Sequence, residues 1–138
     1  MVKYSRQREC ILKNLTGRRD HPTADMVYKS VRAEYPNISL GTVYRNLSML
    51  ASSGQVLRIT TGMGPDRFDG VIEPHVHFVC RTCGNVMDMT HVPIRNKIDL
   101  TDAQFDGVID GYELQVYGKC AECLSIEKEQ QKTFTTMI

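Results

Sequence analysis

The sequence predicts an α+β protein of two small domains, and three observations support this prediction. Apolar residues of the first half recur mainly with helical spacing, whereas those of the second half alternate in short strand-like runs. The charge also changes sign: residues 1–65 contain ten Lys and Arg against four acids, and residues 66–138 contain seven against twelve. Finally, two closely spaced cysteine pairs both lie in the second half. The expected domains are residues 1–71 and 74–138.

The first domain is expected to begin with three helices. Residues 4–15 place their apolar side chains on one face, while their basic side chains can reach solvent. A second helix is predicted after Thr23, a favourable N-cap, and it ends before Pro36. A third helix starts after Ser39 and ends at Gly54.

A hairpin follows these helices. Residues 56–60 alternate as a strand, residues 62–65 (Gly-Met-Gly-Pro) form a turn, and residues 67–71 return. Three helices and a hairpin in this order predict a winged helix-turn-helix, in which the third helix enters the major groove of DNA. The candidate DNA contacts are Thr42, Tyr44, Arg45 and Asn46, together with Arg6 and Arg8 of the first helix.

The residue types of the third helix suit DNA. Arg45 can bind guanine or phosphate through two N–H groups, and Tyr44 offers a ring to a thymine methyl and a hydroxyl to phosphate. The net charge of +6 on residues 1–65 also favours a polyanionic partner. A plain three-helix bundle with a basic face is the alternative, and the wing pattern argues against it.

The second domain is predicted to be a small α/β unit. Its expected elements are strands at residues 76–79 and 86–89, a helix at 94–104, a strand at 112–117 and a short polar helix or tail at 124–131. A sheet of so few strands buries little apolar surface alone. We therefore expect a homodimer, which would also provide a second DNA-binding domain for the other half of a palindromic DNA site.

The cysteine pairs indicate a metal site. Cys80 and Cys83 form one C-x2-C pair, Cys120 and Cys123 form another, and four thiolates make a closed structural Zn²⁺ site. Two disulfides or a thioredoxin-like redox pair are alternatives. Against them, the chain has no signal peptide and no transmembrane run, and Cys10 has no evident partner. We expect a cytoplasmic protein that does not bind membranes.

Five longer motifs occur in a fixed order along the chain. They are H-P-T-A-D-x-V-Y at residues 21–28, S-L-G-T-V-Y-R-N-L at 39–47, R-F-D at 67–69, H-x-H-F-x-C-x-x-C-G at 75–84 and Y-G-x-C-x-x-C at 117–123. In this order and spacing they resemble the ferric uptake regulator family. The resemblance implies a dimeric, metal-dependent transcriptional repressor rather than an enzyme. It further implies a DNA-binding winged helix, a C-terminal dimerisation domain and a double-stranded operator with an AT-rich inverted repeat.

The resemblance also assigns a regulatory metal site. Its three imidazoles and two carboxylates suit Fe²⁺ or Mn²⁺. Aspartates rather than glutamates among the ligands resemble the peroxide-responsive branch of the family, in which peroxide oxidises a ligand histidine when Fe²⁺ is bound and the repressor then releases DNA. The oxidation-sensitive positions would be His21 and His75. The implied ligands are His21, Asp69, His75, His77 and Asp88, drawn from both domains.

Some features depart from the family or leave alternatives open. The positions of a further metal site found in some members are Pro74, Val76, Arg95 and Tyr112, which do not form a ligand set, so we expect one regulatory and one structural metal per subunit. His91 has no counterpart in this scheme. The alternatives are an iron- or zinc-responsive repressor, a small zinc enzyme, for which the H-x-E pattern is absent, and a cysteine-based thiol switch.

Overall fold

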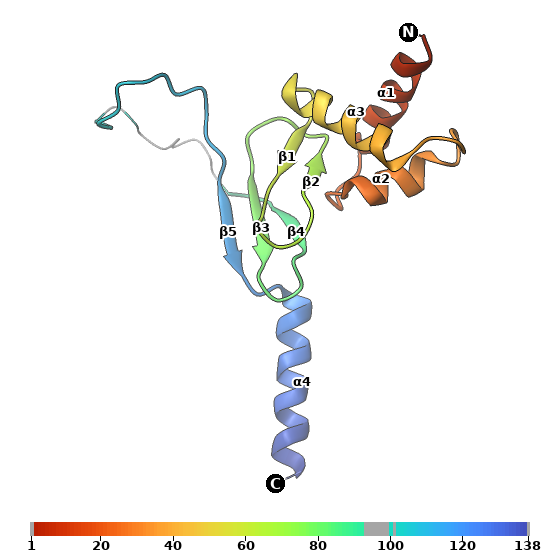
Figure 1. Cartoon of the computed structure of the whole chain (residues 1–138). Coiled ribbons are helices and arrows are strands. Elements are labelled where there is room, and N and C mark those ends of the chain that lie inside the picture. The colour runs from red at the N-terminus through yellow and green to blue at the C-terminus, as the bar shows by residue number, and fades with distance from the viewer. Residues whose placement is uncertain (1, 93–99, 101, 138) are drawn as a thin grey trace. The chain divides into compact units, whose positions relative to one another are not determined.

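The protein is represented by a computed structural model that describes residues 2–92, 100 and 102–137. The chain divides into two compact units, Met1–Glu73 and Pro74–Ile138 (Figure 1). Helices and small sheets occur together, which confirms the predicted α+β class. Within the described residues, no helix combines the length and the apolar character needed to cross a membrane.

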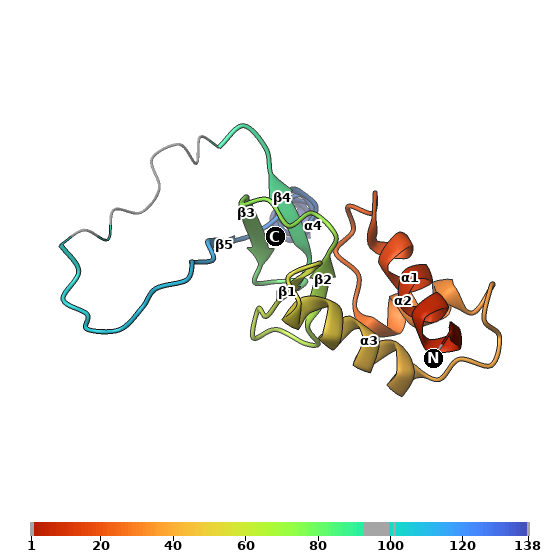
Figure 2. The ribbon, with the colours of Figure 1, turned by 90° about the horizontal axis from the view of Figure 1, so that it is seen from above.

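Three helices make up most of the first unit: α1 (Val2–Leu15), α2 (Ala24–Val31) and α3 (Leu40–Ser52). Seen from above, they lie against one another (Figure 2). Because each helix is apolar on one face, packing these faces together removes them from water. The resulting core consists of Ile11, Leu15, Val27, Val31, Ile38, Val43, Leu47, Leu50, Val56 and Phe68.

The predicted starts of the second and third helices are confirmed, as is the N-cap predicted at Thr23, and Ser39 caps the third helix. The hydroxyl of Thr23 accepts a hydrogen bond from the backbone N–H of Met26 at 3.3 Å, and the hydroxyl of Ser39 accepts one from the N–H of Thr42 at 3.1 Å. Each cap satisfies a backbone donor that has no partner within its helix. The start of α3 is therefore fixed, and so is the set of its residues that face outward.

The wing of the first unit is an antiparallel pair, β1 (Leu57–Ile59) and β2 (Arg67–Asp69). Both strands are shorter than predicted. Directly after β2, Gly70 approaches α1 so closely that a Cβ atom there would lie 2.8 Å from the carbonyl oxygen of Leu15. This position requires glycine, because a backbone oxygen at the end of a packed helix cannot move aside.

The second unit contains a three-stranded sheet in the order β4-β3-β5. β3 (Val76–Cys80) pairs antiparallel with β4 (Val86–Met89) and parallel with β5 (Gln115–Gly118). The strand predicted at 112–117 thus begins three residues later. A parallel neighbour requires a long connection, which the residues between β4 and β5 provide. The buried apolar side chains of this sheet are Val76, Val79 and Val86.

The C-terminal helix α4 (Ala121–Met137) is much longer than the predicted 124–131 (Figure 1). It begins directly after Cys120, whose carbonyl accepts a hydrogen bond from the N–H of Leu124 at 2.9 Å. Its last turns contain several threonines, which are usually poor helix formers. Here their hydroxyls bond to carbonyls four residues earlier, namely Thr133 to Glu129 (3.1 Å), Thr135 to Gln131 (2.9 Å) and Thr136 to Lys132 (2.9 Å).

The helix predicted at 94–104 falls largely outside the described residues, which exclude 93–99 and 101. Residues 100 and 102–104 are described and are not helical, so the prediction is wrong for them. The reason lies in their local hydrogen bonds. The N–H of Ala103 bonds to the carbonyl of Leu100 at 3.1 Å, and the N–H of Phe105 bonds to the carbonyl of Ala103 at 3.1 Å. These short-range bonds close tight turns instead of continuing a helix.

Candidate metal centres and DNA-binding surface

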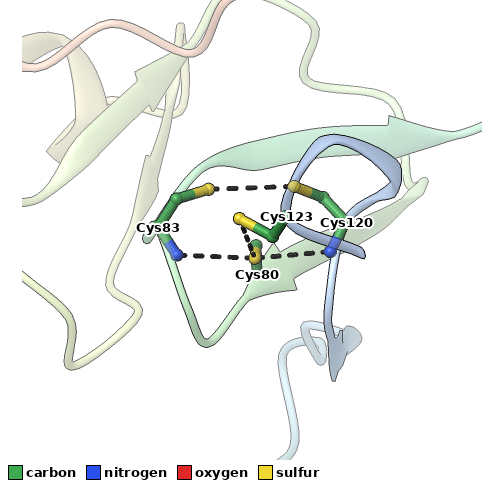
Figure 3. Close-up of side chains that lie close together, drawn as sticks. All are labelled: Cys80, Cys83, Cys120 and Cys123. Carbon is green, nitrogen blue, oxygen red and sulfur yellow. Dashed lines mark hydrogen bonds between the residues drawn. The ribbon is translucent and has the colours of Figure 1, made fainter. Parts of the chain in front are cut away.

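Four cysteines of the second unit form one cluster (Figure 3). Cys80 ends β3, Cys83 lies in the turn toward β4, Cys120 precedes α4, and Cys123 lies in its first turn. Their sulfurs all lie within 4.8 Å of one another. The sulfurs of Cys80 and Cys123 are 3.8 Å apart, and those of Cys83 and Cys120 are 3.9 Å apart.

These distances fit a tetrahedral metal ion and exclude disulfides. Four Zn–S bonds of about 2.3 Å in tetrahedral directions place the sulfurs about 3.8 Å apart. A disulfide would require about 2.05 Å, and all five cysteines of the chain are free thiols. The donor set of four soft sulfurs leaves no open coordination position, which is typical of a structural zinc site.

The electrostatics of the cluster also favour a bound cation. Backbone N–H groups of Cys83 (3.5 Å) and Cys120 (3.3 Å) donate to the sulfur of Cys80, and they lower the pKa of Cys80 to about 5. In contrast, the adjacent Cys120 side chain and burial raise the pKa of Cys123 to about 12. One thiolate therefore forms readily, but further thiolates at this distance need a positive charge between them.

The first unit contains a buried histidine–aspartate pair, His21 and Asp69. The Nε2 atom of His21 lies 3.4 Å from Oδ2 of Asp69, and the side chains are 1% and 2% exposed. The backbone of His21 has φ 49°, a left-handed conformation that is costly for a residue other than glycine. It is held there by Arg67, whose Nη1 donates to the His21 carbonyl at 3.0 Å, and by the N–H of Phe68, which donates to the carbonyl of Pro22 at 2.9 Å.

The second unit contains the other predicted regulatory ligands, His75, His77 and Asp88. His77 on β3 lies opposite Asp88 on β4 in the antiparallel register. Oδ1 of Asp88 lies 3.1 Å from Nε2 of His75 and 3.5 Å from Nε2 of His77. The two imidazole rings are 4.3 Å apart between centroids. The structure therefore groups the five predicted ligands as a pair in the first unit and a triplet in the second, and both groups combine imidazole with carboxylate.

The outer face of α3 presents three of the six predicted DNA contacts, Thr42, Tyr44 and Arg45. Tyr44 is 46% exposed, and Arg45 is exposed with its Nη2 donating to the hydroxyl of Thr42 at 3.1 Å. Asn46 differs, because it is only 5% exposed. Its Nδ2 donates to the carbonyl of Thr42 at 2.9 Å, and its Oδ1 accepts from Nε of Arg8 at 3.1 Å. Asn46 thus holds Arg8 of α1 against α3 and does not face outward.

Sequence reasoning missed two arginines. Arg67 fixes the His21 carbonyl, yet the R-F-D motif had drawn attention only to Asp69. Arg58 on β1 lies with its guanidinium carbon 5.7 Å from the centroid of the Tyr44 ring. The available signal was its position in a short wing strand directly after α3, the helix expected to enter the major groove (the recognition helix). Arg6, which was predicted as a contact, is exposed on α1.

Two residues of uncertain role in the sequence have clear surroundings. Cys10 is only partly buried, and its thiol donates to Oε2 of Glu34 at 3.1 Å. Burial, reinforced by Glu34, raises the pKa of Cys10 to about 11, so this thiol is a poor nucleophile near neutral pH. His91 is exposed in a turn.

Comparisons with known proteins agree on one family. Residues 1–117 match the model of the ferric uptake regulator family. The peroxide operon regulator of Bacillus subtilis is 37% identical over 123 residues, which cover 88% of this chain and 84% of that protein. The peroxide-responsive repressor PerR of Staphylococcus aureus is 35% identical over 123 residues, covering 88% and 82%. The crystal structure of the Campylobacter jejuni peroxide stress regulator superposes with a TM-score of 0.68 at 30% identity, covering 88% and 92%.

Members of this family are DNA-binding, dimeric transcriptional regulators and not enzymes, which excludes the small zinc enzyme considered from the sequence. The predicted resemblance is confirmed by the extent of the match and by the identity to its members. The chain therefore belongs to the ferric uptake regulator family and is a metal-responsive transcriptional repressor.

Proposed function

We propose that this repressor senses hydrogen peroxide: it binds an operator as a homodimer and releases it when a histidine of its regulatory metal site is oxidised. The observation that supports this most is that both carboxylates paired with the candidate histidines belong to aspartates, Asp69 and Asp88. The relatives from Bacillus subtilis, Staphylococcus aureus and Campylobacter jejuni are likewise named as peroxide regulators.

The regulatory ion is proposed to be Fe²⁺ or Mn²⁺, bound jointly by both ligand groups. The first group offers two donors and the second offers three, so the two groups together would supply five of the about six ligands that such ions favour. Sharing one ion would join the DNA-binding unit to the dimerisation unit. Metal binding then favours DNA binding, and by linkage DNA binding favours metal retention. The cluster of four cysteines is proposed to bind a separate, structural Zn²⁺.

The candidate histidines suit different parts of this mechanism. His21 is buried and its backbone is fixed by Arg67, so it can orient a ligand nitrogen without rearrangement. The side chain of His75 is 19% exposed, so a small oxidant can reach it from solvent. Bound Fe²⁺ would supply the redox chemistry that activates peroxide. In the net reaction the ring C2–H becomes C2=O and one water leaves, so the imidazole gains one oxygen atom.

Oxidation would remove the histidine as a ligand for a simple reason. The product ring has an amide-like N–H group in place of the basic nitrogen whose lone pair binds metal. The metal affinity therefore falls, and the coupled DNA affinity falls with it. Mn²⁺ would support DNA binding without this chemistry, so the ratio of the two metals would set the sensitivity to peroxide.

Mass spectrometry tests this proposal directly. Protein loaded with Fe²⁺ or Mn²⁺ is exposed briefly to dilute peroxide, and DNA binding and peptide masses are measured on the same sample. We expect a gain of about 16 Da on the peptide of His21 or His75 with iron only, accompanied by loss of DNA binding. The exposed His91 should remain unmodified in the same digest and serves as the internal control.

The remaining outcomes distinguish the alternatives. Unmodified histidines with metal-dependent DNA binding retained would identify an iron- or zinc-responsive repressor and reject peroxide sensing. Oxidation confined to Cys80, Cys83, Cys120 and Cys123 would instead identify a thiol switch.

A further inference from the structure

Arg58 joins the recognition helix to the wing. Its Nη2 donates to the hydroxyl of Ser48 at 2.6 Å, and its Nη1 makes longer hydrogen bonds of 3.5 Å to the hydroxyl of Tyr44 and to Oδ2 of Asp66. Ser48 and Tyr44 are one turn apart on α3, whereas Asp66 directly precedes β2. One guanidinium therefore contacts two turns of the helix and the far strand of the hairpin.

Two aromatic rings further fix this guanidinium. Its carbon lies 5.7 Å from the centroid of the Tyr44 ring and 5.4 Å from that of Phe68, which is fully buried and lies opposite Arg58 in the β1–β2 register. A planar guanidinium stacks on aromatic faces better than an ammonium does, and it forms hydrogen bonds in several directions at once. The Phe68 ring anchors Arg58 to the core, and Arg58 in turn restrains the exposed ring of Tyr44.

The hydrogen bond from Arg58 also affects the Tyr44 hydroxyl. When this oxygen accepts a hydrogen bond from Arg58, its own O–H remains available as a donor. DNA offers many acceptors to such a donor, including phosphate oxygens and the acceptor atoms of bases in the major groove. Meanwhile Asp66 compensates the charge of Arg58, and the two side chains are 32% (Arg58) and 28% (Asp66) exposed. Arg58 is thus less suited to bind phosphate itself than the exposed Arg45.

We propose that Arg58 is a positioning residue for operator recognition, which orients Tyr44 and fixes the wing relative to the recognition helix. This inference rests on the DNA-binding part of the proposed function and is independent of peroxide sensing. It assigns Arg45 and Arg58 different tasks. Arg45 contributes charge to phosphate binding, whereas Arg58 acts through Tyr44.

The test measures DNA binding of Mn²⁺-loaded protein to an inverted-repeat duplex, selected by the unsubstituted protein from a randomised pool, and to a scrambled duplex. Arg58→Lys keeps the charge but cannot make the same set of contacts. We expect affinity for the selected duplex to fall about tenfold, with little change for the scrambled duplex and an unchanged salt slope. Arg45→Ala is the matched control. Loss of a phosphate contact should weaken binding to both duplexes and reduce the slope of log affinity against log salt concentration by about 1.

A double-mutant cycle separates positioning from independent contacts. If Arg58 acts through Tyr44, the effect of Arg58→Lys should shrink at least about threefold in a Tyr44→Ala background. Additive effects, a reduced salt slope for Arg58→Lys, or unchanged discrimination between the duplexes would each overturn the inference. Circular dichroism confirms that each variant is folded. If the unsubstituted protein selects no duplex, the proposed function itself fails, so the two failures are distinguishable.

Discussion

Cys83→Ser is expected to unfold the second unit and to abolish both dimerisation and DNA binding. The sheet of this unit buries few apolar side chains, and the four-cysteine cluster ties α4 to the turn between β3 and β4. In small zinc-binding folds the metal contributes roughly 10–16 kcal/mol of apparent folding free energy, which matches or exceeds the about 5–15 kcal/mol that typically stabilises a whole domain. Zinc content by plasma mass spectrometry, with far-UV circular dichroism and sedimentation, measures the effect.

Cys10→Ser is the matched control for this experiment. Cys10 is the one cysteine of the chain outside the cluster, and serine can retain the hydrogen bond to Glu34. This variant should keep its zinc, its dimeric state and its circular dichroism spectrum. A Cys83→Ser protein that remains a zinc-loaded, DNA-binding dimer would contradict the structural role of the cluster.

His75→Ala is expected to leave the protein folded, zinc-loaded and dimeric, yet to remove the dependence of DNA binding on Mn²⁺. His75 is partly exposed and precedes β3, so its loss costs little packing. It removes a ligand from the proposed regulatory site. Because allosteric coupling is typically 5- to 150-fold, the stimulation of operator affinity by Mn²⁺ should fall from roughly that range to none. Fluorescence anisotropy with labelled duplex, with and without Mn²⁺, gives this ratio.

His91→Asn provides the comparison for His75→Ala. His91 is exposed in a turn with φ 62°, a conformation that asparagine tolerates. The variant should respond to Mn²⁺ as the unsubstituted protein does. Undiminished stimulation by Mn²⁺ in His75→Ala would show that His75 does not bind the regulatory ion.

Local signals in the sequence were sufficient to place the starts of α2 and α3 in the first unit. The N-caps at Thr23 and Ser39 depend only on a hydroxyl and a nearby backbone N–H, so they are visible from adjacent residues. The cysteine spacing likewise identified four residues that the structure brings together, although 36 residues lie between the two pairs in the sequence. These residues could be grouped despite their separation in the sequence, because two C-x2-C pairs have few roles other than binding one metal ion together.

Contacts made at a distance were not predictable in the same way. An asparagine at this position of α3 could form hydrogen bonds to a base. The orientation of the Asn46 side chain is instead set by Arg8, 38 positions earlier on another helix. Arg58 depends on Ser48, Asp66 and two aromatic rings that only the hairpin brings together. The predicted C-terminal helix ends at residue 131, before several threonines, which have low helix propensity. In the structure α4 continues through these threonines to Met137, and their hydroxyls bond to carbonyls four residues earlier.

Counting bound Mn²⁺ tests the central claim, that ligands from both units share one regulatory ion, most directly. Zinc-loaded protein is titrated with Mn²⁺ and free ion is followed by electron paramagnetic resonance, for the unsubstituted chain, Asp69→Asn and Asp88→Asn. We predict one tight Mn²⁺ per subunit and at least about tenfold weaker binding in each variant, although the two aspartates lie in different units. Two independent ions per subunit, or unchanged affinity in either variant, would contradict the shared site.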